Sequence, residues 1–284
     1  MARLTIRHIQ AMKNNKQPIT MLTAYDLTSA RIAEKAEIPM LLVGDTLGMV
    51  IQGHDSTIPV MLDHMIYHCA IVARVTERPF IVGDLPFMTY QISPEQAMQS
   101  AARLMQEGGV SAVKLEGGAS IAPTIQRITE AGIPVMAHIG LTPQSVNQFG
   151  GFRVQGKDLE SARQLVDDAL AVQEAGAFAV VLELVPAKLA VHITELLDIP
   201  TIGIGAGVGC DGQVQVFHDI LALFDDFVPK HTKHYANLGD AILEAMQSYR
   251  TDVEARTFPT EENSFSIDDS VIAMLQKETA DATH

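Results

Sequence analysis

Short apolar segments alternate with longer amphipathic segments along most of this chain, and this alternation restricts the fold more than any other feature. The apolar segments are nearly continuous, which predicts strands buried on both faces, as in parallel sheets covered by helices. The predicted strands are Ile19–Tyr25, Met40–Val43, Phe80–Val82, Ala112–Gly118 with its terminal turn, Val135–His138, Ala177–Leu182, Thr201–Ile204 and a short eighth at Val214–His218.

The segments between these strands carry helical periodicity together with helix-start and helix-stop residues. Ser93 followed by Pro94 is one such start, and Gly108 after Glu107 is one such stop. The predicted helices are Thr28–Glu37, Asp63–Glu77, Ser93–Glu107, Ile121–Ala131, Asp158–Glu174, Pro186–Leu197 and Asn237–Tyr249.

About eight strand–helix steps in about 250 residues predict an α/β fold, a TIM (β/α)8 barrel. A doubly wound sheet is the alternative, although no Gly-x-Gly-x-x-Gly follows the first strand. No change in composition interrupts the steps. We therefore predict one barrel catalytic domain at residues 1–250, with a short N-terminal extension, and a polar, acidic tail at residues 251–284 that is peripheral or partly disordered.

Charge and cysteine content narrow the possible partners and location. The 284 residues include 20 basic and 34 acidic side chains, a net charge of −14, which argues against a nucleic-acid-binding surface. No apolar run approaches the roughly 18 residues of a membrane span, and the N-terminus Met1–Lys16 has no apolar signal core. The two cysteines, Cys69 and Cys210, form no CxxC motif. These features predict a cytoplasmic protein with no nucleic-acid or membrane partner.

Acidic residues and a histidine follow several of the predicted strands, at the end of a barrel where catalytic residues lie. They are Asp26, Asp45, Asp84, Glu116, His138 and Glu183. Asp45, Asp84 and Glu116 follow three successive strands, so their carboxylates can converge on one point and would repel one another there. A hard divalent cation relieves that repulsion, and oxygen ligands favour Mg²⁺. The alternative is that each acid caps a helix or binds a loop amide.

Four other features each allow two interpretations. Lys114 shares a strand face with Glu116, so it either serves an anionic substrate or balances that acid. His138 is either a catalytic group or a hydrogen-bonded wall residue. Gly203–Gly207 is either a phosphate site or a tight turn, and we favour the turn. The glycine-containing segment Gly140–Lys157 is either a lid or a structural surface loop.

At these residues the sequence closely resembles the ketopantoate hydroxymethyltransferase family. The resemblance covers about residues 1–265, and the matching runs are highly specific when taken together in this order. They are Thr23-Ala24-Tyr25-Asp26, Gly44-Asp45-Thr46-Leu47-Gly48-Met49, Gly83-Asp84-Leu85-Pro86-Phe87, Val113-Lys114-Leu115-Glu116-Gly117-Gly118, His138-Ile139-Gly140-Leu141-Thr142-Pro143-Gln144, Val154-Gln155-Gly156-Lys157, Glu183 in its strand, and Ile202-Gly203-Ile204-Gly205-Ala206-Gly207.

The resemblance implies a TIM barrel enzyme that forms a large homo-oligomer, typically a decamer. It implies that 5,10-methylenetetrahydrofolate gives a one-carbon unit to the 2-oxo acid 3-methyl-2-oxobutanoate, with Mg²⁺ stabilising an enolate. The product, 2-dehydropantoate (ketopantoate), belongs to pantothenate biosynthesis and the coenzyme A pathway.

The resemblance also implies roles for individual residues. It gives Mg²⁺ the ligands Asp45, Asp84 and Glu116, and it makes Glu183 the proton acceptor. It assigns contacts with the 2-oxo acid to Asp45, Thr46, Asp84 and Lys114, and His138 is expected to join them. The family usually has Ser where this chain has Thr46. Because the hydroxyl is kept, we expect the contact to persist in a tighter pocket.

Two other functions are compatible with a metal-binding barrel. The first is a carbon–carbon lyase or mutase of the isocitrate lyase type, but the Lys-Lys-Cys-Gly-His loop usual there is absent from this sequence. The second is a non-catalytic barrel that binds an anionic metabolite. Metal-dependent turnover of 3-methyl-2-oxobutanoate distinguishes both from the transferase.

Overall fold

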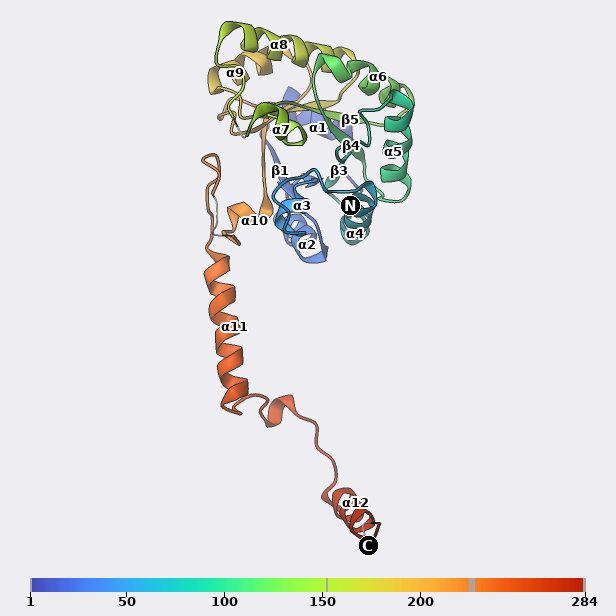
Figure 1. Ribbon diagram of the computed structural model, residues 1–284, viewed down its shortest axis with the longest axis vertical. Helices are drawn as coiled ribbons and strands as arrows, with labels where there is room; N and C mark the ends of the chain where they lie inside the picture. Colours follow the sequence, from blue (N-terminus) through green and yellow to red (C-terminus); the bar gives the residue numbers. More distant parts are fainter. Residues whose placement is uncertain (1, 152, 225–227, 283–284) are drawn as a thin grey trace. The chain divides into compact units, whose positions relative to one another are not determined.

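Eight parallel strands close into a barrel in sequence order in the computed structural model, which describes residues 2–151, 153–224 and 228–282 (Figure 1). The barrel closes where Ile19 of the first strand lies opposite Gly212 of the last. The strands are β1 Ile19–Thr23, β2 Met40–Val43, β3 Phe80–Asp84, β4 Ala112–Glu116, β5 Val135–Gly140, β6 Ala179–Glu183, β7 Thr201–Ile204 and β8 Gly212–Gln215. The predicted TIM barrel is confirmed.

Helices follow most of the strands, and several begin at a side-chain cap, of which the sequence predicted the one at Ser93. Ser93, Asp26 and Asp158 each accept a hydrogen bond from a backbone N–H in the first turn of α5, α2 and α8. The helices of this part are α1 Ile6–Asn14, α2 Leu27–Lys35, α3 Leu47–Val50, α4 Leu62–Val75, α5 Pro94–Gln106, η1 Ala119–Ile121, α6 Ala122–Glu130, η2 Pro143–Ser145, α7 Val146–Phe149, α8 Leu159–Glu174, α9 Ala187–Leu196 and α10 Phe217–Ile220.

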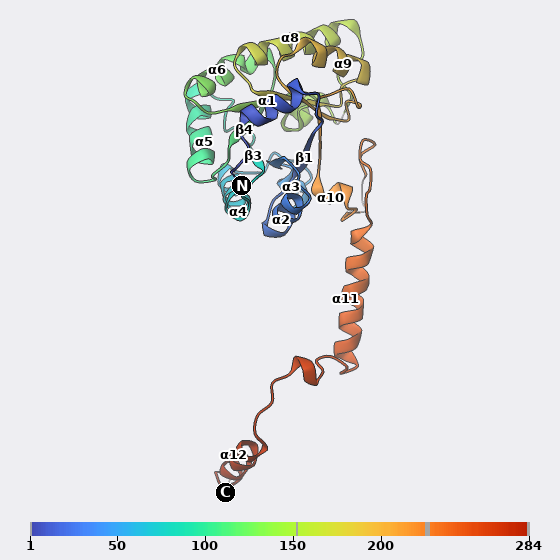
Figure 2. The same cartoon turned by 180° about the vertical axis from the view of Figure 1, so that it is seen from behind.

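The eighth strand and the N-terminal extension differ from the prediction. The eighth strand lies at Gly212–Gln215, and the predicted Val214–His218 runs into helix α10 instead. β7 reaches β8 without a helix, through a turn in which Gly205 and Gly207 have positive φ. The N-terminal extension contains helix α1 (Figure 2). Its Ile9 packs among the interior residues of the barrel.

Side chains alternate between the barrel interior and the layer beneath the helices. In β4, Val113 and Leu115 belong to the layer beneath the helices, whereas Ala112 packs inside with Met136 of β5. Lys114 is buried as well, at 4% exposure. Because Lys114 and Glu116 alternate with Val113 and Leu115, the strand directs both charged side chains into the interior.

The chain divides into two compact units, Met1–Tyr235 and Ala236–His284, and the second contains no strand among its described residues. Its helices are α11 Leu238–Glu254, η3 Glu261–Asn263 and α12 Asp269–Asp281. The predicted helix Asn237–Tyr249 is therefore present and longer, and α12 lies in the segment expected to be a polar tail. The domain boundary after residue 250 stays a prediction. No helix among the described residues is long and apolar enough to cross a membrane.

Candidate active site

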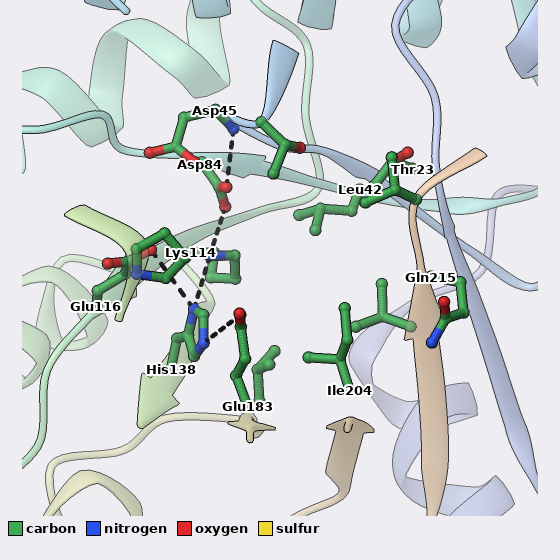
Figure 3. A pocket seen from close by; sticks show the side chains of 15 residues that line it. Thr23, Leu42, Asp45, Asp84, Lys114, Glu116, His138, Glu183, Ile204 and Gln215 are labelled. Atoms are coloured by element: carbon green, nitrogen blue, oxygen red, sulfur yellow. Dashed lines mark hydrogen bonds and ion pairs between the residues drawn. The ribbon is translucent and has the colours of Figure 1, made fainter. Parts of the chain in front are cut away.

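The carboxyl ends of the barrel strands surround one pocket (Figure 3). Every residue to which the family resemblance gave a role lies there. The lining residues are Thr23, Leu42, Asp45, Thr46, Asp84, Lys114, Glu116, His138, Pro143, Val181, Glu183, Ile204, Val214, Gln215 and Val216. Asp26, the remaining acid at a strand end, is instead the N-cap of α2, where it accepts from Ser29 N at 2.7 Å.

Asp45 and Asp84 form the acidic centre of the pocket. Asp45 N donates to Asp84 Oδ2 at 3.1 Å, which brings the ends of β2 and β3 together. Both side chains are buried, at 2% and 3% exposure. Burial first, and then the charge of Asp84, raises the pKa of Asp45 from 3.8 to about 7. An ionised Asp45 is therefore costly in this pocket unless a cation accompanies it.

Lys114 supplies the positive charge at the centre of this cluster. Its Nζ lies 3.0 Å from Asp84 Oδ1 and 3.3 Å from His138 Nδ1. Burial lowers the pKa of Lys114, but the charges of Asp84, Glu116 and Asp45 outweigh it and raise that pKa above its usual value. Lys114 is thus a permanent cation that pairs most closely with Asp84 rather than with Glu116 on its own strand.

His138 connects this cation to Glu183. Its Nε2 lies 3.2 Å from Glu183 Oε2, and its Nδ1 faces Lys114 Nζ. A lysine ammonium only donates, so His138 Nδ1 must accept, and the proton of the neutral ring is on Nε2, the nitrogen beside Glu183. Burial, and then the charge of Lys114, lowers the pKa of His138, which keeps the ring neutral. The protonated ring nitrogen therefore lies next to one oxygen of Glu183.

Glu116 completes the acidic side of the pocket. It is 6% exposed, and its Oε1 lies 3.6 Å from His138 Nδ1. Burial is the largest cause that raises the pKa of Glu116 above its usual value, and Asp45 and Asp84 add to it against the opposing charge of Lys114. Its Oε2 accepts from Gln144 N at 3.0 Å. Gln144, buried at 4% exposure, is a site residue that the sequence analysis did not single out. The signal available was its position six residues after His138, at the same barrel end.

The opposite side of the pocket is largely apolar, although Thr23 and Gln215 also lie there (Figure 3). Leu42 and Ile204 stand across the cavity from the acids and His138 (Figure 3). Val181 and Val214 line the same pocket and belong to the interior apolar cluster. Beside the acids, Thr46 Oγ1 makes a 2.7 Å hydrogen bond with the hydroxyl of the buried Tyr25. The pocket thus offers charged groups to one end of a small ligand and branched aliphatic groups to the other.

The donor atoms fit a hard cation in type and charge, although they are not already arranged as a metal centre. No group of three or more Asp, Glu, His or Cys side chains in the described part of the chain is positioned to hold a metal ion. Asp84 is bonded to Asp45 N and paired with Lys114, and Glu116 accepts from Gln144 N. The pocket contains three clustered carboxylates but one buried lysine, so a divalent cation would offset the excess negative charge.

The segments Gly203–Gly207 and Gly140–Lys157, for which the sequence left two interpretations open, both lie at this barrel end. Gly205 and Gly207 have φ of 65° and 80°, and a Cβ on Gly207 would lie 2.5 Å from that of Ala187. This agrees with a tight turn in Gly203–Gly207. The segment Gly140–Lys157 contains η2 and α7, and its Phe152 lies outside the described residues. Its role as a lid stays a prediction.

Comparison with known proteins decides the family. The model of the ketopantoate hydroxymethyltransferase family matches residues 3–261. The chain belongs to the ketopantoate hydroxymethyltransferase family. A 3-methyl-2-oxobutanoate hydroxymethyltransferase of Chloroflexus aurantiacus is 60% identical over 271 residues, which cover 95% of this chain and 96% of the relative. The enzyme of the same name from Dehalococcoides mccartyi is 55% identical, with coverage of 97% and 98%. The chain is therefore an enzyme, a hydroxymethyltransferase, as the resemblance implied.

Solved structures extend the likeness in fold. A 2,3-dimethylmalate lyase, described as a PEP mutase/isocitrate lyase superfamily member, aligns over 99% of each chain with a TM-score of 0.59 and 17% identity. A phosphonomutase-like protein from Burkholderia cenocepacia aligns over 88% of this chain and 99% of its own, with a TM-score of 0.60 and 16% identity. At such low identity these likenesses concern the barrel alone.

Proposed function

We propose that this hydroxymethyltransferase uses 5,10-methylenetetrahydrofolate to hydroxymethylate 3-methyl-2-oxobutanoate, giving 2-dehydropantoate for the synthesis of pantothenate and coenzyme A. The observation that carries the proposal is the contact between His138 and Glu183, 3.2 Å long, beside the acidic cluster. It places the Glu183 carboxylate next to a site that can accept a 2-oxo acid. Family membership supports the choice of substrate.

The two sides of the pocket match the two ends of this substrate. Its carboxylate and 2-oxo group are polar and suit Lys114 and the hydroxyl of Thr46. Its isopropyl group suits the apolar side formed by Leu42, Ile204 and Val214. In this orientation C3, the carbon that must lose a proton, lies between the polar and apolar sides. Asp45, Asp84 and His138 are the remaining candidates for substrate contact.

Mg²⁺ fits the acidic side of the pocket. Asp45, Asp84 and Glu116 would hold it, because they combine oxygen donors with an excess of buried negative charge. When bound, the ion supplies Lewis-acid stabilisation for negative charge that develops on the 2-oxo oxygen. Lys114 keeps one cation in the pocket whether or not the metal is bound.

Glu183 takes the proton from C3 in this proposal. The Nε2 of the neutral His138 ring lies 3.2 Å from Glu183 Oε2, which limits the orientations open to the carboxylate and leaves its other oxygen to accept the proton. Lys114 contacts His138 Nδ1 and so holds the ring in the required tautomer. Loss of the proton makes C3 a carbon nucleophile towards the one-carbon unit. His138 is therefore a positioning residue for the base.

The assembly and location of the enzyme are proposed from the family resemblance. We propose a homo-oligomer, a decamer, in the cytoplasm. Light scattering coupled to size exclusion would measure the molar mass of the particle directly. A mass equal to that of the 30.8 kDa monomer would contradict the assembly.

Turnover with defined components tests the proposed reaction. Purified enzyme is incubated with 3-methyl-2-oxobutanoate, 5,10-methylenetetrahydrofolate and Mg²⁺, and the product is followed by mass spectrometry. We expect a product heavier than the substrate by the CH₂O unit only when all three components are present, with loss of product in EDTA and recovery with excess Mg²⁺. Equal product formation in EDTA would contradict the role of the metal, and no product with fully folded enzyme would contradict the reaction.

A further inference from the structure

Gln144 contacts acids from two different strands. It lies in η2 (Pro143–Ser145), the first turn after β5. Its Nε2 donates to Asp45 Oδ2 at 2.8 Å, and its backbone N donates to Glu116 Oε2 at 3.0 Å. Gln144, in the turn after β5, therefore fixes one oxygen of Asp45, which follows β2, and one oxygen of Glu116, at the end of β4.

The side-chain amide has only one workable orientation. Nε2 also donates to Leu85 O at 3.0 Å, so both of its neighbours are acceptors. Oε1 accepts from Tyr90 Oη at 2.8 Å and from Gln91 Nε2 at 3.1 Å. Rotating the amide by 180° would place oxygen against the Asp45 carboxylate and the Leu85 carbonyl. All polar positions of the amide are therefore used, and it is rigid.

Tyr90 extends this arrangement to the backbone of β4. Its hydroxyl accepts from Glu116 N at 3.1 Å while it donates to Gln144 Oε1. Tyr90 is 2% exposed, so its hydroxyl has no competing solvent. The acids at the ends of β2 and β4 are thus held relative to one another through Tyr90 and Gln144 rather than through their own strands, which are not neighbours in the barrel.

We infer that Gln144 is the positioning residue of the acidic centre. By occupying Asp45 Oδ2 and Glu116 Oε2, it leaves Asp45 Oδ1 and Glu116 Oε1 to face a divalent cation and the 2-oxo acid. Residues that hydrogen-bond metal ligands set their orientation, and loss of such a residue lowers metal affinity about 10–100-fold. This inference rests on the proposed function, because it assumes that the acids bind Mg²⁺.

Magnesium titration of three proteins tests the inference. Gln144→Met keeps the length of the side chain and removes the amide. Gln91→Leu is the matched control, because Gln91 is exposed and bonds the same Gln144 oxygen without touching either acid. Calorimetric titration of each protein with Mg²⁺ alone should give at least tenfold weaker binding for Gln144→Met and a change of less than twofold for Gln91→Leu.

A second readout separates positioning from general damage. At saturating Mg²⁺, Gln144→Met should exchange the C3 proton of 3-methyl-2-oxobutanoate with D₂O at a rate within about threefold of the wild type, because the metal restores the arrangement. If Gln144→Met does not fold, Gln144→Asn replaces it, since it keeps an amide but is one methylene too short to reach Asp45. Unchanged Mg²⁺ affinity in a folded variant overturns the inference alone. Failure of the wild type to bind Mg²⁺ overturns the proposed metal site, and the inference with it.

Discussion

Replacing Asp45 with Asn should stabilise the metal-free enzyme at neutral pH while it removes function. Asp45→Asn keeps the backbone N–H bonded to Asp84 and leaves an amide oxygen to accept from Gln144. The wild-type carboxylate has its pKa raised from 3.8 to about 7 by burial and by Asp84. The folded protein therefore binds a proton that the unfolded chain releases, so the stability of the wild type falls as the pH rises from about 4 to about 7.

The size of this effect follows from the pKa difference. Each pH unit between the unfolded and folded pKa is worth about 1.4 kcal/mol, so ionised Asp45 costs about 4 kcal/mol at pH 8 when its folded pKa is about 7. The gain in stability from Asp45→Asn should therefore increase by about 3 kcal/mol between pH 5 and pH 8. Functional sites commonly lower the stability of the folded protein in this way, because they hold a buried charge that folding alone would disfavour.

Urea denaturation in EDTA, followed by circular dichroism at a fixed protein concentration, measures the stability difference between the wild type and Asp45→Asn at pH 5 and at pH 8. Added Mg²⁺ should stabilise the wild type more at pH 8 than at pH 5, and it should have little effect on Asp45→Asn. A variant that is less stable than the wild type at pH 8, or a stability difference that does not change with pH, would refute the reasoning about Asp45.

Three further variants address separate parts of the pocket. Lys114→Met should weaken binding of the 2-oxo acid at least tenfold and lower the free energy of unfolding by about 3 kcal/mol, because buried Asp84 loses its partner 3.0 Å away. Titration calorimetry measures the binding and urea denaturation measures the stability. Unchanged binding would contradict the role of the lysine. Ile204→Ala should raise kcat/KM for 2-oxo acids with one more methylene about tenfold relative to 3-methyl-2-oxobutanoate, and an unchanged ratio would contradict the apolar side. Tyr25→Phe, which removes the 2.7 Å hydrogen bond to Thr46, should raise KM about threefold to tenfold with little change in kcat. A loss of kcat with unchanged KM would contradict a role of Thr46 in substrate binding.

The barrel could be predicted from sequence because its determinants are local. Side chains of the strand that holds Lys114 and Glu116 alternate with period two, so their position on one shared face followed from the residues alone, whereas the structure shows that this face lines the interior. The helix N-cap at Ser93 was likewise predicted from the residues alone, and the structure confirms it. The prediction was wrong at Val214–His218, because a short polar strand such as β8 is defined by its pairing with Ile19–Leu22 rather than by its own composition. Helix α1 was missed for a related reason, since few of its residues are buried and Ile9 alone is fully covered.

The contacts within the site were harder to foresee. The convergence of Asp45, Asp84 and Glu116 followed from strand order, but their partners did not. Lys114 pairs most closely with Asp84 of the neighbouring strand, and Gln144 reaches Asp45 across a sequence separation of 99 residues. The first contact depends on the register of β3 and β4, which places Asp84 opposite Lys114, and the second depends on the turn after β5, which carries little periodicity. Sequence therefore predicts which side chains meet at the pocket, whereas the hydrogen bonds that orient them require the structure.

Exchange of the C3 proton of 3-methyl-2-oxobutanoate with D₂O tests the central claim, that Glu183 is the base of this site. Proton NMR follows the exchange in Mg²⁺ without any folate, so it isolates proton removal from the transfer of the one-carbon unit. The account predicts rapid exchange with the wild type. It predicts a loss of at least 100-fold with Glu183→Gln, which keeps the shape of the side chain and should still bind Mg²⁺ and the 2-oxo acid. Exchange at the wild-type rate in Glu183→Gln would contradict the account and make His138 the first candidate to remove the proton.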